Sequence, residues 1–135
     1  MRSASAANMV LGQPGRACIL VVEDELLIRC IISEIMRDAG YTVIEAANGD
    51  EALEIVRSDI SLDLVFSDVK MPGAVDGLGL LAAVKSASPE LPVVITSGDC
   101  DPALALEGGA AHFVRKPYDL DAVVELVRDE LERPE

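Results

Sequence analysis

The chain has 135 residues, of which 50% are hydrophobic and 3% aromatic, and its formal net charge is −13. This length predicts one domain with a core of aliphatic side chains. The negative charge argues against direct binding to nucleic acid or to an anionic membrane, because both need a basic surface. It is compatible with a basic protein partner or with a divalent cation bound at an acidic cluster.

The N-terminal residues and the cysteines narrow the class of protein further. Residues 1–16 are rich in Ala, Ser, Gly and Asn without a continuous apolar run, so we expect a disordered leader and not a signal peptide, followed by a domain over 17–133. Cys18, Cys30 and Cys100 are odd in number and lack C-x-x-C spacing, which argues against a zinc site. Unpaired thiols are typical of the reducing cytoplasm, and no apolar run is long enough to cross a bilayer.

Short apolar runs alternate along the chain with segments of helical periodicity. The runs have the length of strands covered on both faces, and they occupy residues 18–22, 41–45, 62–67, 91–96 and 111–114. Helical spacing of apolar residues follows each run, beginning near residues 27, 50, 78, 102 and 120. Gly40 is the expected stop of the first helix and Asn48 the expected cap of the second. The helix over 102–106 is short and opens with Asp101-Pro102.

This alternation predicts a doubly wound parallel sheet with helices on both faces. In such folds the polar residues that follow the strands meet in one crevice at the carboxyl edge of the sheet. The residues in these positions are Glu23, Asp24, Asp68, Thr96, Ser97 and Lys116. We therefore expect a single acidic pocket.

Asp68 is the central residue of this pocket. A carboxylate at the end of a buried strand costs several kcal/mol to desolvate unless it is paired or reactive. Three clustered carboxylates repel one another and suit Mg²⁺ or Mn²⁺, which retain water and phosphate oxygens as further ligands. Thr96 and Lys116 offer a hydroxyl and an ammonium for a developing phosphoryl charge, so we expect Asp68 to be the nucleophile of a phosphoryl transfer.

Four motifs, each at a strand end, carry a family resemblance. They are Val22-Glu23-Asp24-Glu25, Asp68-x-x-Met71-Pro72 with Asp76-Gly77, Ile95-Thr96-Ser97-Gly98, and Phe113-x-x-Lys116-Pro117. With these motifs in this order, the chain from about Cys18 to Arg133 resembles a response-regulator receiver domain of two-component signalling.

The resemblance implies a flavodoxin-like fold, with five helices around a five-stranded parallel sheet of order 2-1-3-4-5. It implies that Asp68 is phosphorylated by a histidine kinase or a histidine phosphotransfer protein. It also implies that Asp24, Asp68 and the backbone carbonyl of Lys70 bind Mg²⁺ directly, with Glu23 acting through water. Thr96 and Lys116 would bind the phosphoryl oxygens, and Phe113 would be the switch aromatic that follows the Thr96 hydroxyl.

The sequence departs from the common family pattern at several places. Glu23 stands where many members have Asp, and the loop from Asp68 to Gly77 is one residue longer than usual. Phe113 lacks the hydroxyl of the usual Tyr, and the segment 99–109, which holds the fourth helix, is short.

Simpler interpretations stand beside these roles. Asp68 could be a turn or capping residue, Thr96 an ordinary strand residue, Lys116 a surface lysine, and Phe113 a core aromatic.

The leading hypothesis for the whole chain is a stand-alone, non-enzymatic receiver that signals by phosphorylation-dependent protein binding or by phosphate relay. The alternative is a small Mg²⁺-dependent phosphatase or phosphotransferase with an aspartyl-phosphate intermediate. Such enzymes of the haloacid-dehalogenase type carry a second Asp where this chain has Lys70. A flavin-binding flavodoxin-like module is a third hypothesis, but the chain lacks its Gly-rich loop and stacking aromatics.

Overall fold

The computed structural model describes residues 16–133, so the predicted leader over 1–16 lies outside the described residues except for Arg16. Five strands form one parallel sheet of order β2-β1-β3-β4-β5, which confirms the predicted topology. The strands are β1 (Cys18–Val22), β2 (Thr42–Ala46), β3 (Leu64–Asp68), β4 (Val93–Ser97) and β5 (His112–Arg115). The helices are α2 (Leu26–Asp38), α3 (Gly49–Arg57), α4 (Gly77–Ala87), α5 (Pro102–Glu107) and α6 (Leu120–Leu131).

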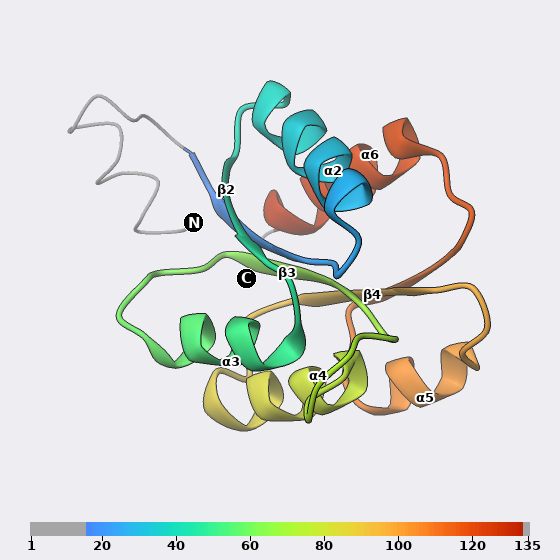
Figure 1. Cartoon of the computed structure of the whole chain (residues 1–135). Helices are drawn as coiled ribbons and strands as arrows, with labels where there is room; N and C mark the ends of the chain where they lie inside the picture. The colour runs from blue at the N-terminus through green and yellow to red at the C-terminus, as the bar shows by residue number, and fades with distance from the viewer. Residues whose placement is uncertain (1–15, 134–135) are drawn as a thin grey trace.

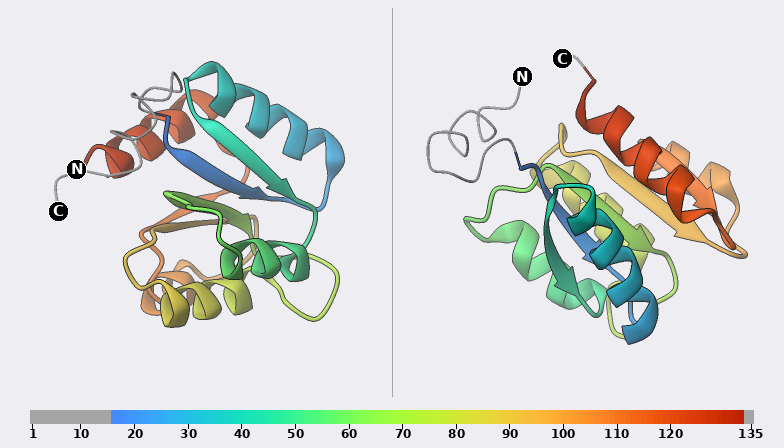
Figure 2. Two further views of the ribbon diagram at one scale, coloured as in Figure 1. Left: turned by 90° about the vertical axis from the view of Figure 1, so that its left-hand side faces the viewer. Right: turned by 90° about the horizontal axis from the view of Figure 1, so that it is seen from above.

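The sheet lies between two layers of helices. Helices α2 and α6 cover one face, and α3, α4 and α5 cover the other (Figure 1). The left-hand view in Figure 2 shows the same three layers from the side. The chain moves outward from β1 to β2 and then returns to β3, and right-handed crossovers in opposite directions place their helices on opposite faces. All five strands therefore end at one edge, and the loops there meet where the strand order reverses.

Two aliphatic cores fill the spaces above and below the sheet. Strands β3 and β4 are buried along their whole length, as continuous apolar runs predict for strands covered on both faces. The core beneath α2 and α6 contains Ile19, Val21, Ile32, Met36, Val43, Leu64, Phe66, Val94, Val123 and Val127. The core on the opposite face includes Leu20, Val22, Ala52, Val65, Leu80, Leu81, Val84 and Ile95.

The expected helix signals are present. Gly40 follows α2 with a φ of 103°, a left-handed conformation that glycine adopts without a Cβ clash, and its N–H donates to the Arg37 carbonyl at 2.9 Å. The Asn48 side chain accepts the Glu51 N–H at 2.8 Å and so caps α3. No helix within residues 16–133 is long and apolar enough to cross a membrane.

Four strands begin and end later than predicted. β2 and β5 are shifted by one residue from the expected 41–45 and 111–114, whereas β3 and β4 begin two residues later and end one residue later. The third strand was expected over 62–67 and lies at Leu64–Asp68, because the Asp63 side chain accepts the Cys18 N–H at 2.8 Å just before the strand begins. The fourth was expected over 91–96 and lies at Val93–Ser97, since Pro92 has no N–H for the sheet. Asp68 is consequently the last residue of β3, and its position is fixed by strand pairing.

Candidate functional site

The acidic pair Glu23 and Asp24 occupies the turn between β1 and α2. The Glu23 side chain is 2% exposed, whereas Asp24 lies at the surface. The Glu23 N–H donates to the Ala46 carbonyl at 3.1 Å, which ties the turn to β2. One oxygen of its carboxylate, Oε2, accepts the Glu25 N–H at 3.1 Å. The turn therefore presents one buried and one accessible carboxylate at the carboxyl edge of the sheet.

Asp68 lies beside this pair at the end of β3 and is 7% exposed. Its Oδ1 accepts the Val69 N–H at 2.9 Å, and its Oδ2 accepts a bond from the Lys116 ammonium at 3.0 Å. The first residue of α4, Gly77, packs directly on the Asp68 backbone, because a Cβ at position 77 would lie 2.1 Å from the Asp68 carbonyl oxygen. Strand pairing and this close contact hold the carboxylate in place.

The three carboxylates converge. One oxygen from each of Glu23, Asp24 and Asp68 can be chosen so that all lie within 4.8 Å of one another. Hard oxygen donors at this spacing, one of them at the surface, suit a magnesium ion that keeps several waters. The residues present therefore fit the Mg²⁺ that the family resemblance implies for this pocket.

Lys116, which follows β5, balances part of the negative charge of the acidic cluster. Its Nζ lies 3.0 Å from Asp68 Oδ2 and 3.5 Å from Glu23 Oε1. Burial favours the neutral amine, but the hydrogen bond and charge of Asp68 and the charge of Glu23 outweigh it and raise the pKa of Lys116. Burial is also the main cause of the raised pKa of Glu23, with the charge of Asp68 adding to it and the Glu25 N–H and Lys116 opposing it.

Thr96 carries an unpartnered hydroxyl. The residue lies on β4 opposite Asp68 and is 1% exposed. Its Oγ1 has no hydrogen-bond partner among the described residues. A buried hydroxyl without a partner costs about 1–3 kcal/mol, and this one belongs to the residue that pairs with Asp68 across the sheet. The neighbouring Ser97 hydroxyl, in contrast, accepts the Cys100 N–H at 3.1 Å.

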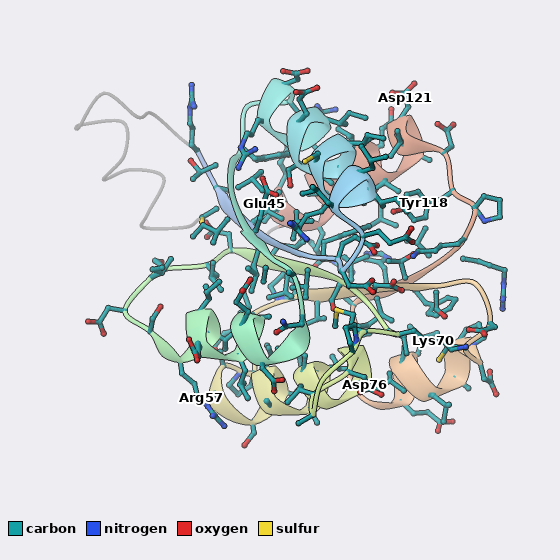
Figure 3. All side chains as sticks on the ribbon, in the orientation of Figure 1. Glu45, Arg57, Lys70, Asp76, Tyr118 and Asp121 are labelled. Carbon is teal, nitrogen blue, oxygen red and sulfur yellow. The ribbon has the colours of Figure 1, made fainter. Side chains whose placement is uncertain are left out.

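Lys70 and Phe113 lie at the margins of the pocket. The Lys70 side chain is 75% exposed and forms an ion pair of 2.5 Å with Asp99, which joins the loop after β3 to the loop after β4. Figure 3 shows Lys70 on the side of α5. The role of its backbone carbonyl as a metal ligand stays a prediction. Phe113 is partly buried against the core on the α3, α4 and α5 face, and the Arg115 guanidinium lies 5.7 Å from its ring centroid. Its role as a switch also stays a prediction.

Sequence reasoning brought Glu23, Asp24, Asp68, Thr96 and Lys116 to one edge, and the structure places all five there. It did not single out three neighbours of the site. They are Asp99, which pairs with Lys70; Arg29, which contacts the Glu23 backbone; and Tyr118, whose ring meets Phe66 edge-on at 6.2 Å. Tyr118 could have been predicted as a neighbour of the site, because it directly follows Lys116-Pro117. The pairing of Asp99 with Lys70 leaves no pattern in the nearby sequence.

The fold and this pocket define an α/β protein with a strand-end aspartate in an acidic, lysine-compensated site. The family model of the response regulator receiver domain matches residues 19–128. The chain therefore belongs to the response-regulator receiver family of two-component signalling, whose members generally act as signalling switches.

Curated relatives agree with this assignment. The chain is 39% identical over 115 residues to the DNA-binding transcriptional regulator NtrC of Escherichia coli (strain K12), which covers 83% of this chain and 24% of that protein. It is 36% identical over 117 residues to the nitrogen assimilation regulatory protein NtrX of Azorhizobium caulinodans, covering 84% and 26%. The chain thus spans about a quarter of the length of these relatives.

Solved structures show the same architecture. The receiver domain of NtrX from Brucella abortus superimposes with a TM-score of 0.77 at 37% identity, covering 86% of this chain and 99% of that one. A receiver domain protein from Clostridium thermocellum gives a TM-score of 0.81 at 30% identity, with coverage of 87% and 95%.

Proposed function

We propose that Asp68 is the phosphoacceptor of this receiver domain and that a histidine kinase or a histidine phosphotransfer protein is the donor. The observation that supports this most directly is the cluster of Glu23, Asp24 and Asp68 with the Lys116 ammonium 3.0 Å from the Asp68 carboxylate. An Asp68 oxygen attacks phosphorus, and the bond from phosphorus to the donor nitrogen breaks as the new acyl phosphate forms.

The remaining site residues have distinct proposed roles. Glu23, Asp24, Asp68 and the Lys70 carbonyl would hold Mg²⁺, which when bound neutralises charge on the phosphoryl oxygens. Lys116 stabilises a phosphoryl oxygen from the opposite side, and the Thr96 hydroxyl gains the partner that it lacks among the described residues. The Thr96 hydroxyl and Phe113 then carry the change toward β5.

An Asp68→Asn variant tests the assignment. Intact-mass measurement after incubation with acetyl phosphate and Mg²⁺ is expected to show one added phosphoryl group on the wild type and none on Asp68→Asn. Asp76→Asn is the matched control, because Asp76 caps α4 through the Gly79 N–H at 2.8 Å and Asn is an equally good cap. Full phosphorylation of Asp68→Asn would place the phosphoacceptor elsewhere.

The surface beside the pocket supports docking of a donor protein with an apolar helical face. A groove of about 440 Å³ runs between the start of α2 and the loop before α6. It is lined by Ile28, Ile31, Ile32, Lys116, Pro117, Tyr118 and Leu120. Lys116 belongs to both the groove and the pocket, so a donor seated here has its phosphoryl group next to Asp68. Leu27, which is 77% exposed, precedes Ile31 by four residues on α2 and so lies on the same side of the helix.

Comparison of two donors tests this docking. An Ile31→Asp variant is expected to react normally with acetyl phosphate but at least about tenfold more slowly with the phosphorylated kinase, because a charge now lies in the apolar contact. Leu104→Asp is the control, since Leu104 is 56% exposed and lies on α5, on the other face of the sheet. Equal transfer rates from the kinase to both variants would exclude the groove.

The output that we propose is protein binding or onward phosphate relay by the domain acting alone in the cytoplasm. The net charge of −13 favours a protein partner over direct contact with nucleic acid. A pull-down that compares beryllofluoride-treated and untreated protein tests this, with Asp68→Asn as the control. No specific observation within residues 16–133 favours the small-phosphatase alternative, because position 70 holds a lysine whose side chain pairs with Asp99.

A further inference from the structure

Arg29 lies one turn into α2, directly behind the acidic pair. Its side chain is 15% exposed. The guanidinium contacts groups in two directions: Nη1 donates to the backbone carbonyl of Glu23 at 2.8 Å, and Nε donates to the Glu45 carboxylate on β2 at 3.2 Å. A planar guanidinium with several fixed donors can make both contacts at once, which a lysine ammonium cannot do with the same geometry.

The Glu23 carbonyl belongs to the peptide unit that joins Glu23 to Asp24. The bond from Arg29 therefore acts on the orientation of the turn that carries both carboxylates. The other end of this turn is held by the bond from the Glu23 N–H to the Ala46 carbonyl at 3.1 Å. With Arg29 present, the turn is fixed to β2 through its N–H and to α2 through its carbonyl. A charge-assisted hydrogen bond of this kind is about twice as strong as a neutral one.

The charge of Arg29 is balanced away from the pocket. Its ion-pair partner is Glu45, which Figure 3 shows on the α2 side of the sheet, and Glu45 also pairs with Arg37 at 3.1 Å. Lys116, in contrast, pairs with the site carboxylates themselves. The two cations thus have different tasks: Lys116 compensates the carboxylates of the pocket, and Arg29 contacts only the backbone between two of them.

We propose that Arg29 is a positioning residue of the acidic pocket: it orients the Glu23–Asp24 turn so that the carboxylates of the pair converge with Asp68. Its effect on the metal rests on the proposed use of this cluster as a Mg²⁺ site. Hydrogen-bonded residues behind metal ligands commonly contribute about 10–100-fold to metal affinity, and a residue that fixes a ligand turn belongs to this class.

The chain supplies a matched control. Arg29 and Arg37 both pair with Glu45 from α2, but only Arg29 contacts Glu23. We expect calorimetric titration with MgCl₂ to give a dissociation constant about tenfold higher for Arg29→Gln than for the wild type, and an unchanged constant for Arg37→Gln. Arg29→Lys retains the charge without the two-directional geometry and is expected to give an intermediate value. Equal affinities for Arg29→Gln and the wild type, or equal losses in Arg29→Gln and Arg37→Gln, would overturn the proposal.

A second measurement needs no metal. The Glu25 N–H donates to the Glu23 carboxylate, so its hydrogen exchange reports on the order of the turn. In metal-free protein, we expect this amide to exchange about tenfold faster in Arg29→Gln than in Arg37→Gln, since loss of one charge-assisted bond is worth about this factor. If the wild type binds no Mg²⁺, the proposed metal site fails, and the exchange rates still decide whether Arg29 orders the turn. Unchanged exchange in Arg29→Gln would refute the positioning role itself.

Discussion

Asp68 and Thr96 are opposite each other at the carboxyl ends of β3 and β4, yet no hydrogen bond joins their side chains. The Asp68 oxygens are occupied by the Val69 N–H and the Lys116 ammonium, and the buried Thr96 hydroxyl has no partner among the described residues. The resting pocket therefore retains one donor that a phosphoryl oxygen can engage.

The first prediction concerns the effect of the unpartnered Thr96 hydroxyl on the free energy of unfolding. Thr96→Val keeps the shape of the side chain and removes the unpartnered group, so we expect the unphosphorylated protein to become more stable by about 1 kcal/mol in urea unfolding. The variant should also lose the conformational response to beryllofluoride, as seen by amide chemical shifts on β5.

Ser33 provides the control for Thr96. Its hydroxyl is also buried and unpartnered among the described residues, but it lies on α2 outside the pocket. Ser33→Ala should stabilise the protein to a similar extent and leave the beryllofluoride response intact. A destabilised Thr96→Val protein would show that the hydroxyl is already satisfied in the resting state.

The second prediction concerns Lys116. In Lys116→Met, the carboxylates of Asp68 and Glu23 lose their common cation, which should cost about 2 kcal/mol in chelator-treated protein because Lys116 is only partly exposed. Mg²⁺ no longer competes with the ammonium for Asp68 Oδ2, so the rise in Tm on adding MgCl₂ should be larger than in the wild type. Lys70→Met, which removes a lysine paired outside the cluster, should show the wild-type rise. A smaller rise in Lys116→Met would contradict this view of the compensation.

The third prediction compares two glycines of α4. Gly77→Ala would place a Cβ 2.1 Å from the Asp68 carbonyl oxygen, so the helix or the strand end must move, at a cost of about 1–3 kcal/mol and with slower phosphorylation. A Cβ added at Gly79 would have Asp76 Oδ1 as its nearest neighbour at 3.4 Å, which is an ordinary contact distance, so Gly79→Ala should stabilise the helix by about 0.5 kcal/mol. Thermal unfolding and the rate with acetyl phosphate distinguish the two, and equal behaviour would speak against close packing of α4 on Asp68.

The fourth prediction concerns alkaline pH. Burial, with the charges of Glu23 and Asp68 adding to it and Lys116 opposing it, raises the pKa of Tyr118 from 10.0 to about 12. Because the pKa is raised in the folded protein, the folded state favours the neutral phenol over the phenolate, and the neutral phenol contributes to stability. This contribution is complete below pH 10.0 and is lost as the pH rises through about 12.

Phenolate absorbance during alkaline titration measures this shift. The chain has two tyrosines, and Tyr118→Phe should remove the component that titrates near 12 while leaving the signal of Tyr41. Titration of Tyr118 at the pKa of a free tyrosine would contradict its burial beside the pocket.

The order of the elements and the convergence of the strand-end residues were predictable, because periodicity and the handedness of crossovers fix them. The contacts between side chains were not. Lys116 meets Glu23 across 93 positions of sequence, and Arg29 meets Glu45 across 16. Such pairs depend on side-chain length and on the exact spacing of elements, neither of which leaves a local pattern.

The exact boundaries of the strands were also not predictable from the sequence. The apolar run that begins at Leu62 suggested a strand from that residue, but the Asp63 carboxylate binds the start of β1 and the regular ladder begins at Leu64. Hydrophobicity predicts which residues are buried, whereas the pairing of individual backbone groups decides where a strand begins.

The place of Lys116 directly after the last strand has a consequence during synthesis. Glu23, Asp24 and Asp68 leave the ribosome well before the lysine that compensates them, because β1 and β3 precede β5 in the chain. A nascent chain that has formed the first four strands thus holds three repelling carboxylates without their resident cation. Arrival of β5 and of Lys116 after it completes the sheet and brings the cation to Glu23 and Asp68, so we expect a chain truncated before β5 to lack this charge balance.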